Sequence, residues 1–323
     1  MGRLDEKRTL LVTGGLGFIG SHFIELCLKN GHRVYNIDKQ TYAANKDLVF
    51  KGDYHYIKDD ISEVEDLPFC DILVNFAAES HVDNSISKSD NFIKSNTLGV
   101  YNLIEIIKNK QLSNLMMAWN YEPPLFVQIS TDEVFGDILD GSFRENDRHL
   151  PSNPYSATKS AAEQLIVAWA RTYSLPYIIT RTTNNYGPRQ FPEKLIPKII
   201  TSILSNEKVP VHGNGQYIRN WIHVQDNVNG IYQIINNGDV NDSYHIASDE
   251  EYSVKEIVEK VCKIFNVKYD DIVDNSSDRS GADLRYALNY DRLQLLGWKQ
   301  EYNLNESLLK TIDYYKKKND SAI

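Results

Sequence analysis

The sequence predicts an α/β protein built on a doubly wound parallel sheet. Through its first half, short apolar runs of strand type alternate with amphipathic helical segments. That order is typical of parallel strands joined by crossover helices. A glycine-rich turn also stands between the first strand and the first helix. Right-handed crossovers place helices on both faces of the sheet, and a ligand is expected beyond the carboxyl ends of the strands.

The expected elements follow one another along the chain. Each helix carries apolar residues three and four positions apart, and each strand is a short apolar run. Gly31 ends the first helix, because glycine is a typical helix stop. The expected strands are Thr9–Thr13, Arg33–Ile37, Tyr54–Ile57, Ile72–Phe76, Leu125–Ile129 and Tyr177–Thr180, and the expected helices are Phe18–Asn30, Phe92–Lys108 and Tyr155–Tyr173.

After Gly187 the regular alternation stops. Three further amphipathic helices are expected, at Leu195–Leu204, Val254–Phe265 and Leu304–Tyr315. We therefore expect residues 1–186 to form the doubly wound domain with the catalytic residues. Residues 187–323 should form a smaller α/β domain that binds the substrate. No Pro/Gly/Ser-rich linker separates the two parts, so they should pack closely with an interleaved boundary.

Composition excludes several classes of protein. The chain has 323 residues, of which 41% are hydrophobic and 24% charged, as in a folded globular protein. Its net charge of -9 disfavours a general role in nucleic-acid binding. No apolar run reaches the ~18 residues of a membrane span. The three cysteines have neither metal-ligand nor disulfide spacing, so we expect no metal and a cytoplasmic location.

The glycine-rich turn predicts a dinucleotide site. Gly14, Gly17 and Gly20 lie between a strand and a helix, where they allow a tight turn, close approach to a pyrophosphate and close helix packing. Asp38 ends the second strand, where a carboxylate can accept hydrogen bonds from a ribose and would repel a 2′-phosphate. The pattern favours NAD over NADP, although Lys39 follows Asp38. The alternatives are a turn without ligand and a solvated strand-end aspartate.

Two further motifs predict acid–base chemistry. Tyr155 and Lys159 stand four residues apart, so the phenol and the ammonium can reach one site. A nearby ammonium and a cationic nicotinamide would favour the phenolate. Thr131, Asp132 and Glu133 follow the strand Leu125–Ile129, and adjacent carboxylates can divide acid and base roles if their pKa values differ. Taken alone, each motif is also compatible with a structural helix pair or an acidic turn.

Together these motifs resemble those of the nucleotide-diphosphate-glucose 4,6-dehydratases, which act on dTDP-glucose or UDP-glucose and belong to the extended short-chain dehydrogenase/reductase family. The resemblance extends from about Thr9 to Trp298. It rests on Thr13–Gly20, Asp38-Lys39, Ala77–Asp83, Ser130–Gly136, Tyr155-x-x-x-Lys159, Asn184–Pro188, Phe191–Pro197 and Arg219–Trp221.

The resemblance implies a lyase that uses bound NAD in a Rossmann domain, residues 1–186, with a nucleotide-sugar-binding domain at 187–323. Such a lyase makes a 4-keto-6-deoxy sugar, an intermediate in the synthesis of rhamnose. It also implies a homodimer paired through the helices Phe92–Lys108 and Tyr155–Tyr173.

The resemblance also implies individual roles. Tyr155 accepts the proton of the C4 hydroxyl, which Thr131 orients, while Lys159 lowers the pKa of Tyr155. Glu133 removes the C5 proton, and protonated Asp132 gives its proton to the leaving C6 hydroxyl. NAD would contact Gly14, Gly17, Phe18, Ile19, Gly20, Asp38, Lys39, Thr41, Asp60, Ile61, Ala77, Ala78, Ser95, Tyr155, Lys159 and Asn185. The substrate would contact Ser80, Thr131, Asn184, Lys194, Leu195, Pro210, His212, Arg219, His245 and Arg279.

Departures from the family pattern concern the nucleotide. They are Pro210–Gly213, Arg219–Trp221, Tyr244–Ile246 and Asp278–Ala282. His212 stands where dTDP-glucose enzymes tend to have tyrosine and matches a Pro-x-His-Gly form of plant UDP-glucose enzymes. This feature favours UDP-glucose, with dTDP-glucose tolerated. His212 and His245 can equally be ordinary loop residues.

Two other readings remain open. A nucleotide-sugar epimerase or a UDP-glucuronate decarboxylase of the same fold would share the glycine turn and the Tyr/Lys pair, but it would not need Asp132 or Glu133. A non-catalytic NAD-binding scaffold would not need Tyr155 and Lys159 either. Incubation with nucleotide-glucoses distinguishes the three by their products.

Overall fold

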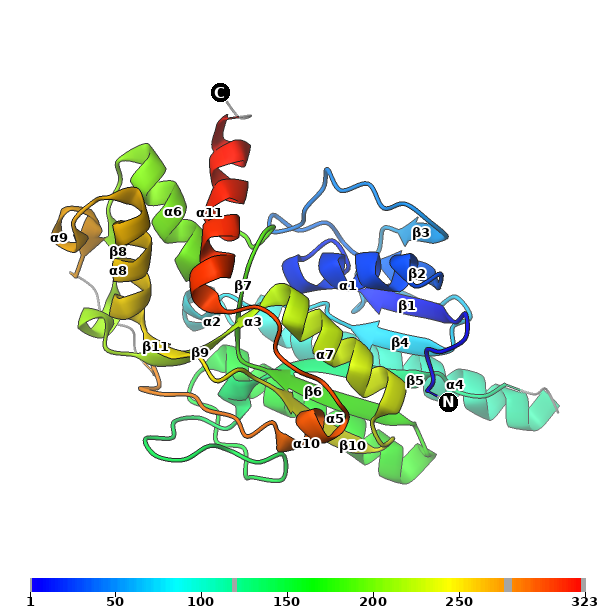
Figure 1. Ribbon diagram of the computed structural model, residues 1–323. Helices are drawn as coiled ribbons and strands as arrows, with labels where there is room; N and C mark the ends of the chain where they lie inside the picture. The colour runs from blue at the N-terminus through cyan, green and yellow to red at the C-terminus, as the bar shows by residue number, and fades with distance from the viewer. Residues whose placement is uncertain (1, 118–120, 276–280, 321–323) are drawn as a thin grey trace.

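The computed structural model describes residues 2–117, 121–275 and 281–320. In this part of the chain the main sheet has seven strands, all paired in parallel, in the order β10-β6-β5-β4-β1-β2-β3. The doubly wound parallel sheet expected from the sequence is therefore confirmed (Figure 1). Its strands are β1 Thr9–Thr13, β2 Arg33–Ile37, β3 Tyr54–Ile57, β4 Ile72–Asn75, β5 Leu125–Thr131, β6 Tyr177–Thr182 and β10 Asp242–Ile246.

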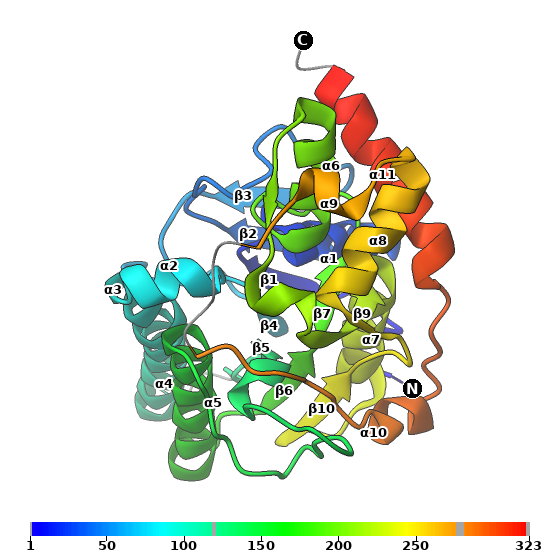
Figure 2. The same ribbon diagram turned by 90° about the vertical axis from the view of Figure 1, so that its left-hand side faces the viewer.

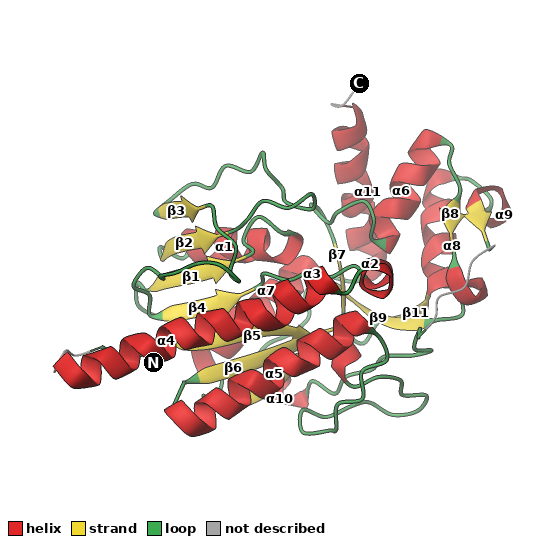
Figure 3. Ribbon diagram, turned by 180° about the vertical axis from the view of Figure 1, so that it is seen from behind, coloured by secondary structure: helices red, strands yellow, loops and turns green. Residues whose placement is uncertain are grey.

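Helices cover both faces of this sheet because successive strand residues point to opposite sides. On β1, Leu10 and Val12 pack in one core with α1 (Phe18–Lys29) and α7 (Val224–Asn237). Leu11 lies between them and packs in the opposite core. That second core is covered by α4 (Gly99–Met117) and α5 (Pro154–Tyr173), which lie side by side in front of the sheet in Figure 3.

The structure corrects several expected element bounds. The helix expected at Phe92–Lys108 begins as α3 (Asp90–Phe92), continues as a π-helical turn, η1 (Ile93–Leu98), and becomes regular only at Gly99. The short helix α2 (Val82–Ser87) precedes it and was not expected. A strand at β10, which joins the main sheet beside β6, was also not expected.

A second lobe lies beside the carboxyl ends of the main strands (Figure 2). Its core is formed by apolar residues of α6, α8 and α11 packed around short strands. The chain leaves the main sheet after β6, returns to it through α7 and β10, and leaves again. The elements outside the main sheet are β7 Asn184–Tyr186, α6 Leu195–Ser205, β8 Val209–Pro210, η3 His212–Gly215, β9 Ile218–His223, β11 Glu251–Ser253, α8 Val254–Phe265, α9 Tyr269–Ile272, β12 Val273–Asp274, α10 Asp291–Leu295 and α11 Leu304–Asp320.

The same described residues contain no helix with the length and apolar character needed to cross a membrane.

Candidate functional site

A cavity of about 330 Å³ opens at the carboxyl ends of the central strands. Its walls come from the glycine turn, the ends of β2, β4, β5 and β6, the start of α5 and the segment before α6. This position is where a doubly wound sheet is expected to bind its ligand.

The glycine turn leaves no room for side chains at two of its three predicted positions. Gly14 has a φ of +69°, and a Cβ there would lie 2.6 Å from the amide nitrogen of Ala77. A Cβ on Gly20 would lie 2.5 Å from the carbonyl oxygen of Gly14. Gly17 is more open, because its Cβ would meet only that same oxygen, at 3.1 Å. The backbone can therefore approach a bound group closely, and α1 begins directly after Gly17 with its first N–H groups available.

Asp38 stands at the end of β2, and its carboxylate accepts backbone hydrogen bonds from the glycine turn and from the residues after β2. Its Oδ2 accepts a hydrogen bond from the amide of Leu16 at 2.9 Å, and its Oδ1 accepts one from the amide of Gln40 at 2.7 Å. Burial raises the pKa of this carboxyl, although both amides oppose the shift. The carboxylate lines the cavity and keeps lone pairs for a ribose hydroxyl.

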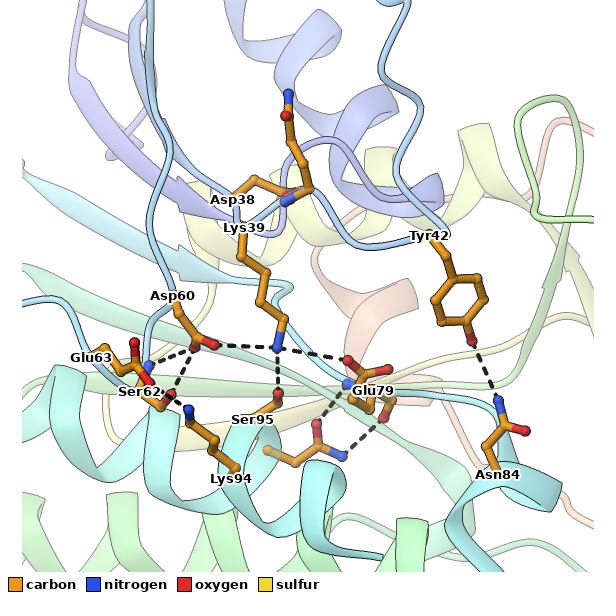
Figure 4. Close-up of polar contacts among 12 residues, drawn as sticks. Asp38, Lys39, Tyr42, Asp60, Ser62, Glu63, Glu79, Asn84, Lys94 and Ser95 are labelled. Atoms are coloured by element: carbon orange, nitrogen blue, oxygen red, sulfur yellow. Dashed lines mark hydrogen bonds and ion pairs between the residues drawn. The ribbon is translucent and has the colours of Figure 1, made fainter. Parts of the chain in front are cut away.

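Lys39 lies at the centre of a polar cluster on the same side of the cavity (Figure 4). Its Nζ is 3.0 Å from Ser95 Oγ, 3.4 Å from Asp60 Oδ2 and 3.7 Å from Glu79 Oε1. Burial raises the pKa of Asp60, but hydrogen bonds from Ser62 and the charge of Lys39 outweigh it and hold that pKa below its usual value. Three acceptors from separate segments thus fix one ammonium group at the cavity wall.

The carboxylates of Asp132 and Glu133 project from η2 (Asp132–Val134), a short 3₁₀ turn that begins where β5 ends. Thr131 Oγ1 donates to Asp132 Oδ1 at 3.1 Å, and the amide of Glu133 donates to Thr131 Oγ1 at 3.3 Å. Asn153 Nδ2 donates to Glu133 Oε2 at 3.2 Å.

Burial changes the acidity of both carboxyls. It raises the pKa of Asp132 to about 7, with a further contribution from the charge of Glu133. Burial also raises the pKa of Glu133, which the hydrogen bond from Asn153 and the charges of Arg219 and Lys194 oppose. Asp132 Oδ2 is buried and has no hydrogen-bond partner among the described residues. One carboxyl of the pair is thus set to hold a proton near neutral pH.

Tyr155 and Lys159 come from the first turns of α5. Pro154 occupies the first helical position, and Asn153 caps the helix by accepting from the Ser156 amide at 3.0 Å. Lys159 Nζ donates to the carbonyl oxygen of Ile129 at 2.6 Å. The cap and this contact fix the start of α5 against the end of β5, so both side chains line the cavity beside Thr131.

The pKa of Tyr155 differs from the expectation. We expected Lys159 to lower it, but burial and the charges of Glu133 and Asp132 raise it, and a hydrogen bond with Thr131 opposes them. Burial lowers the pKa of Lys159 to about 8, while Glu163 opposes that shift. The main reason is that burial disfavours the charged phenolate, and the two carboxyls next to the phenol add to this effect.

Most of the predicted residues lie together along the cavity wall. They are Gly14, Gly17, Phe18, Ile19, Gly20, Asp38, Lys39, Thr41, Asp60, Ile61, Ala77, Ala78, Ser80, Ser95, Thr131, Asp132, Glu133, Tyr155, Lys159, Asn184, Asn185 and Lys194.

Several predicted substrate contacts lie elsewhere. Leu195, Pro210, His212 and Arg219 do not line this cavity, and Arg279 falls outside the described residues. Arg219 nevertheless lies close enough for its charge to lower the pKa values of Asp132 and Glu133.

His245 is placed in the core, against the expectation of a substrate contact. It belongs to β10, is fully buried, and its Nδ1 lies 2.9 Å from the carbonyl oxygen of Asn289. Burial and the charge of Arg181 lower its pKa to about 3, so the ring is neutral. Only the pairing of β10 with β6, a tertiary contact, gives it this position.

Several residues in or next to the cavity had been assigned no role. Glu79, Phe191 and Glu193 line it, and Glu79 faces Lys39. Asn153 does not line the cavity but donates to Glu133. The hydroxyl of Tyr42 lies 3.1 Å from Glu193 Oε2, and its ring meets that of Phe191 at 5.2 Å. Glu79, Phe191 and Glu193 stand within sequence segments that carry the resemblance. Their position in those segments could have identified them as site residues.

Comparison with known proteins identifies the family. The model of the GDP-mannose 4,6-dehydratase family matches residues 11–311. The chain belongs to this family. Among curated relatives, the low-salt glycan biosynthesis protein Agl12 of Haloferax volcanii is 40% identical over 315 residues, covering 95% of this chain and 98% of the relative. The dTDP-glucose 4,6-dehydratase of Neisseria gonorrhoeae is 37% identical over 335 residues, covering 96% of each chain.

Solved structures of this family share the whole architecture. The dTDP-glucose 4,6-dehydratase DesIV of Streptomyces venezuelae, solved with NAD bound, has a TM-score of 0.89 and 32% identity, covering 97% of this chain and 98% of the other. The dTDP-glucose 4,6-dehydratase of Bacillus anthracis in complex with NAD has a TM-score of 0.83 and 32% identity, covering 97% of both.

Proposed function

We propose that this protein is an NAD-dependent hydro-lyase that converts a nucleoside-diphosphate glucose into its 4-keto-6-deoxy derivative. The observation that carries the proposal is one cavity that holds the glycine turn, the Tyr155–Lys159 pair and the adjacent carboxyls of Asp132 and Glu133. An epimerase or a decarboxylase of this fold would use the first two features and leave the carboxyl pair without a role.

The cavity residues fit NAD. The backbone of the glycine turn leaves space for a pyrophosphate, and the carboxylate of Asp38 is placed for a ribose. Asn185 Oδ1 is a buried acceptor with no hydrogen-bond partner among the described residues, and it lines the cavity, where the amide of a nicotinamide would satisfy it. When bound, NAD supplies the oxidation of C4 and the later reduction of C6, and its positive ring favours the phenolate of Tyr155.

Tyr155 and Thr131 act at the C4 hydroxyl. The phenolate of Tyr155 takes the hydroxyl proton while Thr131 holds the oxygen in place. Lys159 is held on the carbonyl of Ile129, and with a pKa of about 8 it is mainly charged at neutral pH. Its charge then favours the phenolate against the nearby carboxyls.

Glu133 and Asp132 carry out the elimination. Glu133 accepts the C5 proton, which the C4 ketone has made acidic, and returns a proton to C5 when C6 is reduced. Asp132, with a pKa of about 7 and a free Oδ2, holds a proton that it gives to the C6 hydroxyl as that group leaves as water. Burial keeps bulk water away from both carboxyls and raises the pKa of each.

We infer that the nucleotide is dTDP. The dTDP-glucose 4,6-dehydratases of Neisseria gonorrhoeae and Haemophilus influenzae match nearly the full chain. The expectation of UDP-glucose depended on His212 lying against the base, and His212 does not line the described cavity. Lys194 lines the cavity, its Nζ donates to the carbonyl oxygen of Ser80 at 2.7 Å, and its charge can meet the diphosphate.

Four further proposals concern the domain division, the pathway, the location and the oligomeric state. We propose division into an NAD-binding Rossmann domain at 1–186 and a nucleotide-sugar domain at 187–323, and a role in rhamnose or deoxysugar synthesis. The three cysteines are free and buried, which supports a reducing cytoplasm. A homodimer through η1, α4 and α5 is supported by exposed apolar side chains on these elements: Ile93, Leu98, Tyr101, Leu112 and Tyr173.

Product analysis tests the proposal. The purified protein is incubated with dTDP-glucose, UDP-glucose and UDP-glucuronate, and the products are identified by NMR. We expect a 4-keto-6-deoxy product from dTDP-glucose without net formation of NADH. A C4 epimer or a pentose product would favour the other enzymes of this fold, and no product with any substrate would favour a scaffold.

A further inference from the structure

Arg181 and Glu163 form a buried ion pair that contacts residues on either side of η2 (Asp132–Val134), the turn that carries the two carboxyls. The reaction as proposed gives this pair no role. Arg181 on β6 donates from Nη2 to Glu163 Oε2 on α5 at 2.7 Å and from Nε at 3.1 Å. Glu163 is 1% exposed and Arg181 is 5% exposed. Neither side chain lines the described cavity, so neither is placed to touch substrate or cofactor.

Glu163 contacts the segment on the N-terminal side of the turn. Its Oε1 accepts a hydrogen bond from Ser130 Oγ at 2.5 Å, and Ser130 immediately precedes Thr131. Glu163 also follows Lys159 by four residues on α5, so the two share a helix face. Its negative charge raises the pKa of Lys159 against the effect of burial.

Arg181 contacts the segment on the other side of the turn. Its guanidinium lies over the ring of Phe135, 4.9 Å from the centroid, and Phe135 directly follows η2. Its Nη1 also donates to the carbonyl oxygen of Glu145 at 2.9 Å. The Phe135 ring is enclosed further by Phe143 at 4.9 Å and His149 at 5.2 Å. One ion pair therefore reaches both ends of the segment that carries the two carboxyls.

We propose that Glu163 and Arg181 are positioning residues that clamp the two ends of the Thr131–Val134 segment and so set its carboxyls against Tyr155 and Lys159. The inference rests on the proposed function, because it assigns the pair to the same reaction. Stability alone does not account for the charges, since a buried ion pair can often be replaced by well-packed apolar residues without loss of stability.

Charged and titratable groups of several elements pack around the start of α5, but the pKa of Lys159 responds to burial, which lowers it, and to the charge of Glu163, which opposes that shift. Glu163 and Tyr155 lie on its own helix, Arg181 comes from β6, and Asp132 and Glu133 follow β5. His149, in the segment before α5, has its Nε2 3.6 Å from Glu163 Oε2, and burial lowers its pKa. Glu163 is the acidic group whose charge acts on Lys159, so its neutralisation should lower the pKa of Lys159 further.

The test begins with Glu163→Gln, which keeps the size of the side chain. We expect kcat for dTDP-glucose to fall about tenfold and the alkaline limb of its pH profile to move about one unit lower, as Lys159 loses its proton earlier. KM should stay within about twofold, because the residue does not line the cavity. Asp226→Asn is the matched control, since Asp226 is also a fully buried carboxyl but lies on α7. It should leave kcat and the pH profile unchanged.

A double variant separates positioning from folding. Glu163→Leu with Arg181→Met removes both charges together, so the fold should survive even if Glu163→Gln alone is unstable. We expect its Tm to be close to the wild-type value while kcat stays at least about tenfold reduced. Wild-type kcat and pH profile in this folded variant would overturn the proposal.

A direct titration makes the outcome independent of turnover. The ¹³Cε resonance of Lys159, assigned with Lys159→Met in lysine-labelled protein, reports its pKa in the purified protein. We expect a lower pKa in Glu163→Gln and in the double variant than in the wild type or Asp226→Asn. An unchanged pKa would overturn the proposed link to Lys159. If the wild type makes no keto-sugar but the titration shifts as expected, the proposed function fails and the contact between Glu163 and Lys159 stands.

Discussion

The two sides of the cavity differ in how far their charged side chains are compensated by hydrogen bonds and opposite charges. On the cofactor side, Lys39 is surrounded by Asp60, Ser95 and Glu79, and the carboxylate of Asp38 accepts two backbone hydrogen bonds. On the catalytic side, Asp132 leaves one buried oxygen without a partner. Compensated charges give a fixed surface for binding, whereas uncompensated burial shifts pKa values toward neutrality and leaves groups ready to exchange protons.

The pKa shifts follow this division at Asp60, Asp132 and Lys159, whereas burial raises the pKa of Asp38 on the cofactor side as well. Hydrogen bonds and Lys39 hold the pKa of Asp60 below its usual value. Burial raises the pKa of Asp132 to about 7 and lowers that of Lys159 to about 8. Substitutions on the catalytic side should therefore change rate constants, and those on the cofactor side should change binding and stability.

The largest expected effect comes from separating the two carboxyls. Glu133→Gln should still allow oxidation at C4 but should lose exchange of the C5 proton with solvent, because the base is gone. Asp132→Asn should exchange C5 yet eliminate water slowly. Positioned acids and bases contribute about 10²–10⁴ in rate, so losses of that size are expected. Deuterium incorporation and product formation, followed by NMR, measure the two steps separately.

The two variants are controls for each other, because Glu133→Gln and Asp132→Asn change adjacent carboxyls of the same turn. Normal deuterium entry at C5 in Glu133→Gln would show that this assignment is wrong. Equal loss of both steps in both variants would mean that the carboxyls act only as a unit.

On the cofactor side a strong effect should come from Gly20→Ala. Its Cβ would lie 2.5 Å from the carbonyl oxygen of Gly14, so the turn must shift. We expect Tm to fall and the Kd for NAD to rise by at least about tenfold. Gly17→Ala is the control for packing, because its Cβ meets only the Gly14 oxygen, at 3.1 Å. It should weaken NAD binding with a smaller loss of Tm, as measured by calorimetry.

The sequence was informative where function depends on local geometry. The glycine turn, Asp38 and the Tyr155–Lys159 spacing are each contained within one loop or one helix, and the structure brings them to one cavity. His245 was misplaced because its burial depends on the pairing of β10 with β6, between residues far apart in sequence. The raised pKa of Tyr155 was missed for a similar reason, since it depends first on burial in the folded chain and then on carboxyls that arrive from another element.

A pH-dependent effect should distinguish Asp132 from ordinary carboxyls. Its pKa in the folded chain, about 7, lies above its usual value of 3.8, so the folded protein binds the proton more tightly. The stability that this proton provides is fully present below about pH 4 and is lost as the pH rises through 7. Asp132→Asn carries no such charge. Its Tm should therefore rise relative to the wild type between pH 5 and pH 8, and parallel Tm curves would contradict the raised pKa.

A smaller effect is expected at Lys39. Lys39→Met keeps the aliphatic stem but leaves Asp60 and Glu79 facing each other without a cation. The Kd for NAD should rise several-fold, by about 1 kcal/mol, because the charge is partly exposed and screened by solvent. Lys94→Met is the control, since Lys94 pairs with the exposed carboxylate of Glu63 and does not line the cavity. NADH fluorescence titration measures both, and equal Kd values would remove Lys39 from the cofactor site.

The smallest effect should be found at His212, where sequence and structure disagree most about the nucleotide. The two bases differ by one methyl group, which a pocket can discriminate by about 1–3 kcal/mol. Because His212 does not line the described cavity, His212→Tyr should change the ratio of kcat/KM for dTDP-glucose and UDP-glucose by less than about threefold. The wild type should prefer dTDP-glucose. A wild-type preference for UDP-glucose that His212→Tyr reverses would place His212 against the base and restore the expectation drawn from the sequence.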